Sequence, residues 1–344
     1  MISRMFTWAA AGIAACTMAT AIAVAQDKVV IGHFGNPTPM QAAAANHEFA
    51  QATGWEIEWR EFASGADVVA AMASGDVDIA ELGSVPFTIA ASQGIDLQLF
   101  MIAQVIGEAE SFVVRDSVDI DGIEALEGKR IAVPFGSTAH FSLMGTLYKA
   151  GLTERDVVLV DLPPDRIEAA WRDETVDAAF VWQPVQSRLL TNGSLLVTAD
   201  ESAEWGYPTF DGWVATGDFA AQNADELAAF IETMDSANSA YLENPSAWTA
   251  DSAPVKAIAE RTGIPSARIP EALRGYTLLS VAEQVGSAWL GRSVMRLIKY
   301  TGGFLTAAGV IDGVAEDYSG FVNTELTRAA MKGRPSRESV KQVR

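Results

Sequence analysis

Short apolar runs alternate with amphipathic stretches through the first part of the chain. Runs of this length, bounded by Gly, Pro, Ser or Asn, are typical of strands, whereas the stretches between them have helical spacing and stop at residues such as Gly54 and Gly75. Strands and helices that alternate in this way predict βαβ units around a parallel sheet. We predict strands at 28–34, 56–62, 77–82 and 97–103, and helices at 40–53, 67–73 and 83–92.

The alternation restarts downstream and gives way to a helical pattern after Asp225. One helix of the second set is capped at Ser137-Thr138 and runs to Lys149, with Gly151 as its stop signal. The other predicted elements are strands at 111–115, 130–134, 157–161, 176–182, 195–198 and 211–215, and helices at 164–171, 227–242, 254–262, 266–273 and 292–308.

These patterns predict an α/β protein of two lobes. The chain passes from one lobe to the other twice, near 104–111 and 203–212. The helical C-terminal part returns to the first lobe. The last twelve residues contain four basic side chains and almost no apolar ones, which predicts a disordered tail. We assign 26–107 and 212–330 to the first lobe, 108–211 to the second, and 331–344 to the tail.

The N-terminal 25 residues have the order of a cleavable signal peptide. Arg4 precedes an Ala-rich apolar stretch that ends in Ala-Val-Ala at 23–25, so we expect cleavage after Ala25 and export. Residues 5–25 are also long enough for a transmembrane anchor. A third alternative is lipidation of Cys16, because residues 13–16 loosely resemble a lipobox.

Composition narrows the classes of partner. The chain is 49% hydrophobic, which supports packed cores and excludes wholesale disorder. Its 44 carboxylates against 24 Lys and Arg give a formal charge of −20, which argues against nucleic acid and against docking on an anionic membrane surface. The single cysteine excludes a disulfide framework and any CxxC site for zinc or redox chemistry.

Motifs of catalysis and of cofactor binding are absent from the sequence. It has no GxSxG, P-loop, GxGxxG, HExxH or EF-hand pattern, and His33, His47 and His140 are not in metal-ligand spacing. We therefore predict no catalytic residue, no metal and no cofactor.

Two strand-to-helix junctions are candidates for binding an anion. Gly83-Ser84-Val85-Pro86 follows a strand and opens a helix, and Gly136-Ser137-Thr138 does the same in the second lobe. A helix N-terminus offers free N–H groups and the positive end of the dipole, to which Ser and Thr add hydroxyl donors. The alternative is that both are ordinary N-caps.

Carboxylates at the crossings are candidates for binding a cation. Glu108 and Glu110 fall at the first crossing, and Asp211 falls at the second, among aromatic residues. A buried carboxylate beside aromatic rings suits an ammonium, through charge-assisted hydrogen bonds and cation–π contact. These acids could instead be solvated surface residues. Trp182, at the end of a strand, is a candidate for ligand stacking or for core packing.

The chain resembles the aliphatic-sulfonate and taurine-binding branch of the periplasmic solute-binding proteins of ABC importers. The similarity spans 28–325. Its most specific part is the combination of STxH at 137–140 with WGxPTxDxW at 205–213. Less specific matches are the stretches 59–66, 73–78, 82–86, 128–135 and 181–184.

The resemblance implies a two-lobed, type II-like periplasmic binding protein fold that holds its ligand in the cleft between the lobes. The implied ligand is taurine or a closely related amino sulfonate, delivered to a permease in the inner membrane by a monomeric periplasmic protein. By this resemblance Ser84, Ser137, Thr138 and His140 hold the sulfonate, Glu110 and Asp211 hold the ammonium, Trp182 covers the ethylene carbons, and Phe34 belongs to the same site.

Two departures from the family pattern leave the ligand open. Phe34 stands in a loop where we expect a tyrosine, and Gln183 stands where we expect a small residue. Another alkanesulfonate or a small organic anion is therefore an alternative ligand. An enzyme of the thiamine-precursor type, or a sensor domain, is an alternative function on the same fold.

Overall fold

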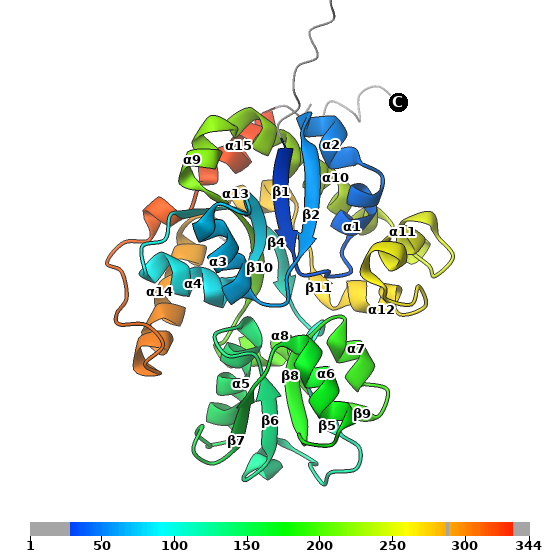
Figure 1. The fold of residues 1–344 in the computed structure, drawn as a ribbon, viewed down its shortest axis with the longest axis vertical. Helices are drawn as coiled ribbons and strands as arrows, with labels where there is room; N and C mark the ends of the chain where they lie inside the picture. The colour runs from blue at the N-terminus through cyan, green and yellow to red at the C-terminus, as the bar shows by residue number, and fades with distance from the viewer. Residues whose placement is uncertain (1–27, 287–288, 333–344) are drawn as a thin grey trace, which may run out of the picture.

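The computed structural model describes residues 28–286 and 289–332, which form two lobes with a sheet in each (Figure 1). The predicted signal peptide at 1–25 lies outside the described residues. So does the predicted tail beyond Lys332, whereas residues 331 and 332 close the last helix rather than belonging to a tail. Over the described part of the chain, none of the helices combines the length and the apolarity needed to cross a membrane.

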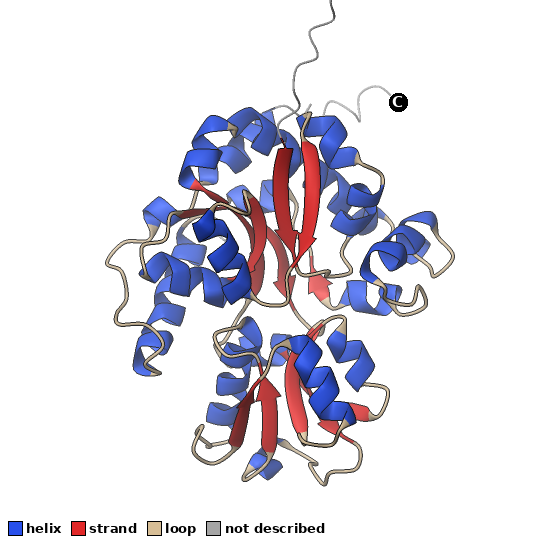
Figure 2. Ribbon diagram, viewed as in Figure 1, coloured by secondary structure: helices blue, strands red, loops and turns tan. Residues whose placement is uncertain are grey.

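The larger lobe contains a six-stranded mixed sheet in the order β11-β4-β10-β3-β1-β2 (Figure 2). Strand β1 runs parallel to β2 and β3, but β10 is antiparallel to β3 and β4, and β11 is antiparallel to β4. The first four strands run in the same direction, as the alternating pattern predicts, but the sheet is mixed rather than parallel. The reason is that β10, which returns from the other lobe, lies between β3 and β4 and runs opposite to both. The strands are β1 (Lys28–His33), β2 (Glu56–Glu61), β3 (Ile79–Gly83), β4 (Leu97–Ile106), β10 (Phe210–Thr216) and β11 (Tyr276–Thr277).

The smaller lobe repeats this arrangement with a five-stranded sheet in the order β7-β6-β8-β5-β9. Strand β6 is parallel to β7 and β8, while β5 is antiparallel to β8 and β9. The strands are β5 (Glu110–Arg115), β6 (Arg130–Val133), β7 (Val158–Asp161), β8 (Ala178–Trp182) and β9 (Gly193–Thr198), and the helices are α5 (Thr138–Lys149), α6 (Pro164–Arg172), α7 (Val185–Leu189) and α8 (Ala199–Glu204).

Helices cover both faces of the larger sheet, so the central strand β3 is buried along its whole length (Figure 2). The predicted helix at 40–53 is two helices, because His47 adopts a left-handed conformation, with φ of 58°, at the junction. The helices of this lobe are α1 (Pro39–Ala45), α2 (Glu48–Thr53), α3 (Gly65–Ser74), α4 (Ser84–Ser92), α9 (Gly217–Gln222), α10 (Ala224–Glu243), α11 (Ala253–Thr262), α12 (Ile269–Arg274), α13 (Val281–Val285), α14 (Arg292–Ala307) and α15 (Thr324–Lys332).

The chain crosses between the lobes at a tight backbone junction. The N–H groups of Gly107 and Ala109 both donate to the Gly275 carbonyl, at 3.1 and 3.2 Å, and this ties the first crossing to β11. A Cβ on Gly275 would lie 2.5 Å from the Ala109 nitrogen, so only glycine permits this approach. At the second crossing Asp211, which the sequence placed at the end of the second lobe, pairs with Gly83 in the larger sheet.

Candidate functional site

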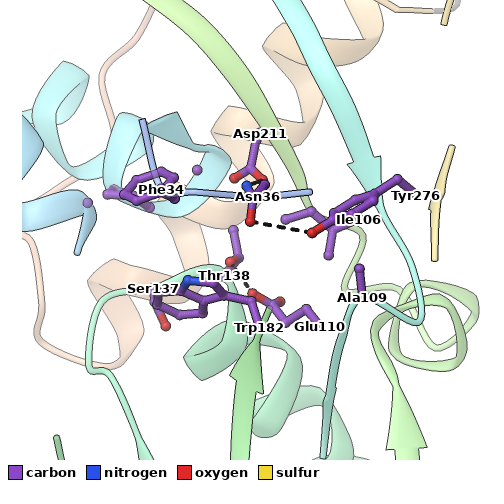
Figure 3. A pocket seen from close by; sticks show the side chains of 13 residues that line it. Phe34, Asn36, Ile106, Ala109, Glu110, Ser137, Thr138, Trp182, Asp211 and Tyr276 are labelled. Atoms are coloured by element: carbon purple, nitrogen blue, oxygen red, sulfur yellow. Dashed lines mark hydrogen bonds between the residues drawn. The ribbon is translucent and has the colours of Figure 1, made fainter. Parts of the chain in front are cut away.

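A cavity of about 410 Å³, which includes the open space at its mouth, lies between the lobes beside both crossings (Figure 3). The larger lobe contributes the loop after β1, the starts of α3 and α4, and residues of β4, β10 and β11. The smaller lobe contributes the start of β5, the start of α5 and the end of β8. The lining residues are Phe34, Asn36, Gly65, Gly83, Pro86, Ile106, Ala109, Glu110, Ser137, Thr138, Trp182, Asp211 and Tyr276.

Six of the candidates from the sequence line this cavity, namely Phe34, Glu110, Ser137, Thr138, Trp182 and Asp211, whereas Glu108, Ser84 and His140 do not. Glu108 is exposed at the first crossing. The Ser84 hydroxyl accepts a 3.3 Å hydrogen bond from the Phe210 N–H and so faces the backbone of β10. The His140 imidazole stacks on Phe135, with ring centroids 4.7 Å apart, and burial lowers its pKa to about 4. Both side chains lie beside the cavity rather than in its wall.

In the larger lobe two buried carboxylates share two amide donors. Gln104 Nε2 donates to Glu81 Oε1 at 2.5 Å and to Asp211 Oδ2 at 2.9 Å. Asn36 Nδ2 donates to the same two oxygens, at 2.9 and 3.4 Å. The Phe34 N–H donates to Glu81 Oε2 at 3.4 Å. Each amide group therefore bridges the two carboxylates and holds them close together.

Burial without a cation dominates the electrostatics of this half of the site. It raises the pKa of Glu81 above its ordinary value. The pKa of Asp211 is raised well above its ordinary value, first by burial and then by repulsion from Glu81 and Glu110. None of the described residues that line the cavity is Lys or Arg, so these charges have no counter-ion in the cavity wall.

In the smaller lobe a third carboxylate faces the cavity with one oxygen unused. Glu110 Oε2 accepts a 2.6 Å hydrogen bond from the Thr138 hydroxyl, while Oε1 is buried and has no partner among the described residues. Burial raises the pKa of Glu110 to about 8, against the opposing effect of the Thr138 hydrogen bond. An unpaired acceptor buried at this position is costly unless a donor arrives from a ligand.

The N-termini of α4 and α5 meet at the cavity from opposite lobes. A Cβ on Gly83, the N-cap of α4, would lie 3.1 Å from the Thr138 methyl group, so the two helix ends are almost in contact. The Ser137 side chain caps α5 by accepting from the His140 N–H at 3.1 Å. The Ser137 hydroxyl donates to the Pro134 carbonyl and the Thr138 hydroxyl to Glu110, so the anion-binding corner consists of the first-turn N–H groups of each helix, which lack acceptors within the helix.

Aromatic side chains complete the wall. Phe34 is buried at the end of β1, and Trp182 is half-buried at the end of β8. The cavity therefore has an anion-binding corner, a carboxylate-rich wall and aromatic surfaces in one space between the lobes. Among the residues that the structure describes, no group of three or more His, Cys, Asp or Glu side chains is arranged to hold a metal ion.

Four polar residues of the site were missed from the sequence. Asn36 and Tyr276 line the cavity, and Glu81 and Gln104 support it from behind. For Glu81 a signal was available, because an acidic residue inside an otherwise apolar strand requires a buried partner. Tyr276 had no such signal, since it lies on a two-residue strand within a part of the chain that reads as helical.

Comparisons with known proteins identify the family of the chain. The family described as NMT1/THI5 like matches residues 37–248. The chain is 36% identical over 300 residues to the taurine-binding periplasmic protein of Escherichia coli K12, a match that covers 87% of this chain and 92% of that one.

Solved structures share the fold at lower identity. The alkanesulfonate-binding protein SsuA from Xanthomonas axonopodis pv. citri, bound to MOPS, superposes with a TM-score of 0.69 and 22% identity, over 83% of this chain and 94% of that one. The desulfurization enzyme DSZB also matches, with a TM-score of 0.62 and 15% identity, over 90% of this chain and 99% of that one. These neighbours confirm the predicted two-lobed α/β fold.

Proposed function

The chain belongs to the NMT1/THI5-like family, and from this premise we propose that it is a periplasmic solute-binding protein of an ABC transporter. It captures taurine or a closely related amino sulfonate between its lobes and delivers it to a permease in the inner membrane. It is exported by a cleaved signal peptide and acts as a monomer, without nucleic acid as a partner. The sequence relative from Escherichia coli, a taurine-binding periplasmic protein, supports this ligand class.

The observation that carries the proposal is the pairing of an anion-binding corner with unpaired buried carboxylates in one cavity. Taurine has a sulfonate and an ammonium separated by two carbons. The sulfonate lies against the starts of α4 and α5, where Ser137 and Thr138 stand, and the ammonium lies between Glu110 and Asp211. Trp182 covers the ethylene carbons.

The two carboxylates that take the ammonium lie on different lobes. Asp211 belongs to the larger sheet and Glu110 to the smaller one. Among the described residues, the hydrogen bonds of both side chains stay within their own lobe. A ligand ammonium between them therefore makes the missing connection and shifts the population from open to closed lobes.

This arrangement disfavours the alternatives. An alkanesulfonate without an amine would leave both buried carboxylates without a counter-ion and Glu110 Oε1 without a donor, which a closed site penalises heavily. The proposed role is binding without covalent chemistry. DSZB shows that the fold also occurs in an enzyme, but at 15% identity the likeness concerns the fold alone.

Calorimetric titration of the mature protein tests the proposal directly. We expect taurine to bind with micromolar or tighter affinity, hypotaurine to bind measurably, and ethanesulfonate to bind far more weakly, with nitrate as a control anion. Equal affinity for taurine and ethanesulfonate would remove the role assigned to Glu110 and Asp211. Turnover of any of these ligands would overturn the proposed binding function.

A further inference from the structure

Three oxygen atoms that face the cavity can each accept a further hydrogen bond. Asp211 uses Oδ2 for both amide donors, and no described residue donates to its Oδ1. Glu110 uses Oε2 for Thr138 and leaves Oε1 buried without a partner. The third acceptor is the phenol oxygen of Tyr276 (Figure 3).

Asn36 fixes the direction of the Tyr276 hydrogen bond. Because Asn36 donates its Nδ2 hydrogens to Glu81 and Asp211, its Oδ1 is the atom that faces Tyr276. The phenol donates to that oxygen at 3.4 Å, so the lone pairs of Oη remain for a ligand. The amide network behind the cavity thus makes Tyr276 an acceptor rather than a donor toward a ligand.

The three acceptors come from three strands, β10, β5 and β11, and meet at one place. All of them line the same cavity, and Asp211, Glu81 and Glu110 all act on the Tyr276 phenol. Burial first, and these carboxylates second, raise the pKa of Tyr276 well above its ordinary value, so the phenol keeps its proton. Its hydrogen bond to Asn36 is therefore retained at any pH at which the protein works.

We infer that these three oxygens select a primary ammonium, one N–H for each, and that Tyr276 is the specificity-determining residue that takes the third hydrogen. The inference rests on the proposed function and narrows its ligand class. An –NH₃⁺ group carries three donors, whereas each N-methyl group removes one and brings apolar volume against a buried oxygen. The site is therefore built against methylated amines.

The aromatic walls of the cavity offer the opposite possibility. Phe34, Trp182 and Tyr276 all line it, and aromatic cages of this kind bind quaternary ammonium groups through their ring faces. In such a cage methylation would leave affinity unchanged or raise it. The acceptors decide against it, because a quaternary head has no N–H to donate to Glu110 Oε1, which is buried without a partner among the described residues, or to Asp211 and Tyr276.

The test is a calorimetric titration of the mature protein with taurine, N-methyltaurine and N,N,N-trimethyltaurine. For the wild type we expect the first methyl group to weaken binding on the order of tenfold, and trimethylation to weaken it further, since each methyl group leaves one buried acceptor without a donor. N-methyltaurine that binds as tightly as taurine, or more tightly, would overturn the inference and favour an aromatic cage.

The variant Tyr276→Phe tests whether the Tyr276 phenol accepts the third hydrogen of the ammonium group. We expect the variant to bind taurine roughly tenfold more weakly and N-methyltaurine with little change, so that the ratio of the two affinities falls toward one. A ratio that stays at its wild-type value would overturn the role of Tyr276. Tyr241→Phe is the matched control, because this tyrosine is buried against Trp248 outside the cavity and should leave both affinities unchanged.

The wild-type ligand series keeps the inference falsifiable whether or not the variant folds. If taurine fails to bind the wild type, both the proposed function and this inference are wrong. If taurine binds but methylation has no effect, the inference alone falls.

Discussion

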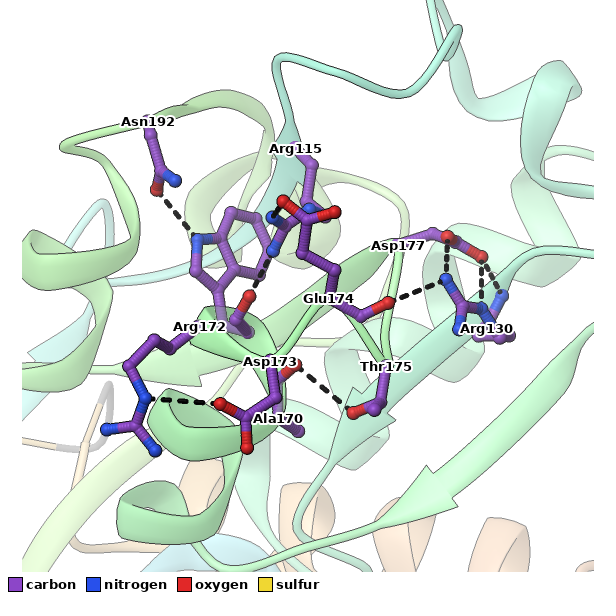
Figure 4. A network of polar contacts seen from close by, with 10 residues as sticks. Arg115, Arg130, Ala170, Arg172, Asp173, Glu174, Thr175, Asp177 and Asn192 are labelled. Atoms are coloured by element: carbon purple, nitrogen blue, oxygen red, sulfur yellow. Dashed lines mark hydrogen bonds and ion pairs between the residues drawn. The ribbon is translucent and has the colours of Figure 1, made fainter.

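The smaller lobe handles buried charge in two opposite ways. At the cavity, Glu110 is buried with an unpaired oxygen and no counter-ion. Away from the cavity, Arg115 is buried but satisfied: its guanidinium lies 5.0 Å above the Trp171 ring, donates to the Trp171 carbonyl, and pairs with Glu174 at 3.1 Å (Figure 4).

The titration of the two regions reflects this difference. Asp177 accepts three hydrogen bonds from Arg130, two from the guanidinium at 2.7 and 3.1 Å and one from the backbone N–H at 2.8 Å, and these hold the pKa of Asp177 below its ordinary value. Burial instead raises the pKa of Glu110 to about 8. Paired charges thus serve the fold of the lobe, and the carboxylate without a counter-ion is the one to which we assign the ammonium of the ligand.

The largest effect should come from removing the carboxylate that the larger lobe presents to the cavity. We expect Asp211→Asn to weaken taurine binding by about 30-fold or more, because breaking a buried charge pair costs about 2–5 kcal/mol. Binding of ethanesulfonate should be spared, and the empty protein should keep or gain thermal stability, since an uncompensated charge is gone. Calorimetry with both ligands and thermal unfolding measure this. Equal weakening of both ligands would make Asp211 structural.

The opposite outcome is expected at the paired cation. Arg115→Met should reduce the free energy of unfolding by about 1–3 kcal/mol, because it removes a buried hydrogen bond and a cation–π contact. Taurine affinity of the folded variant should not change. Urea unfolding and calorimetry test this, and a loss of affinity without a loss of stability would break the comparison.

The two regions should respond to pH with opposite sign. Burial raises the pKa of Glu110 from its ordinary 4.5 to about 8. We expect opening of the empty cleft to expose Glu110 and lower this pKa, so the closed, empty cleft should bind an extra proton between pH 4.5 and about 8. Closure of the empty protein is therefore favoured at low pH and is lost as the pH rises through this window. Asp177, with its lowered pKa, stabilises the fold above its ordinary pKa of 3.8 and loses that contribution as the pH falls.

Scattering measurements of the ligand-free protein at pH 5 and pH 8 test the first of these effects. We expect the more compact form to be more populated at pH 5 in the wild type, and the difference to shrink in Glu110→Gln. A pH response of the same size in that variant would assign it to another group.

The smallest effect is expected at an exposed pair in the same network. The side chains of Arg172 and Asp173 pair at 3.2 Å and are 73% and 61% exposed. Such pairs contribute little, so Arg172→Met should change the free energy of unfolding by less than about 0.5 kcal/mol. This variant is the matched control for Arg115→Met. An equal loss in the two would show that burial does not distinguish them.

The sequence predicted most strands and longer helices because apolar runs and their glycine or proline boundaries are local signals. It missed what depends on distant contacts. The break at His47 arises from a backbone conformation that no pattern marks. Tyr276 reaches the site by contacting Asn36, which lies 240 positions earlier in the chain. The candidate ligand residues were found where a helix start or a crossing marks them, and the amides that hold those residues were not.

The division of the carboxylates between the lobes also affects how the protein communicates with its permease. A closed shape without cargo would press Glu110 toward Asp211 with nothing between them, and their repulsion opposes it. The closed conformation therefore indicates that the cleft holds a ligand. We expect a permease that recognises the closed conformation to bind little ligand-free protein, because the ligand-free protein rarely closes.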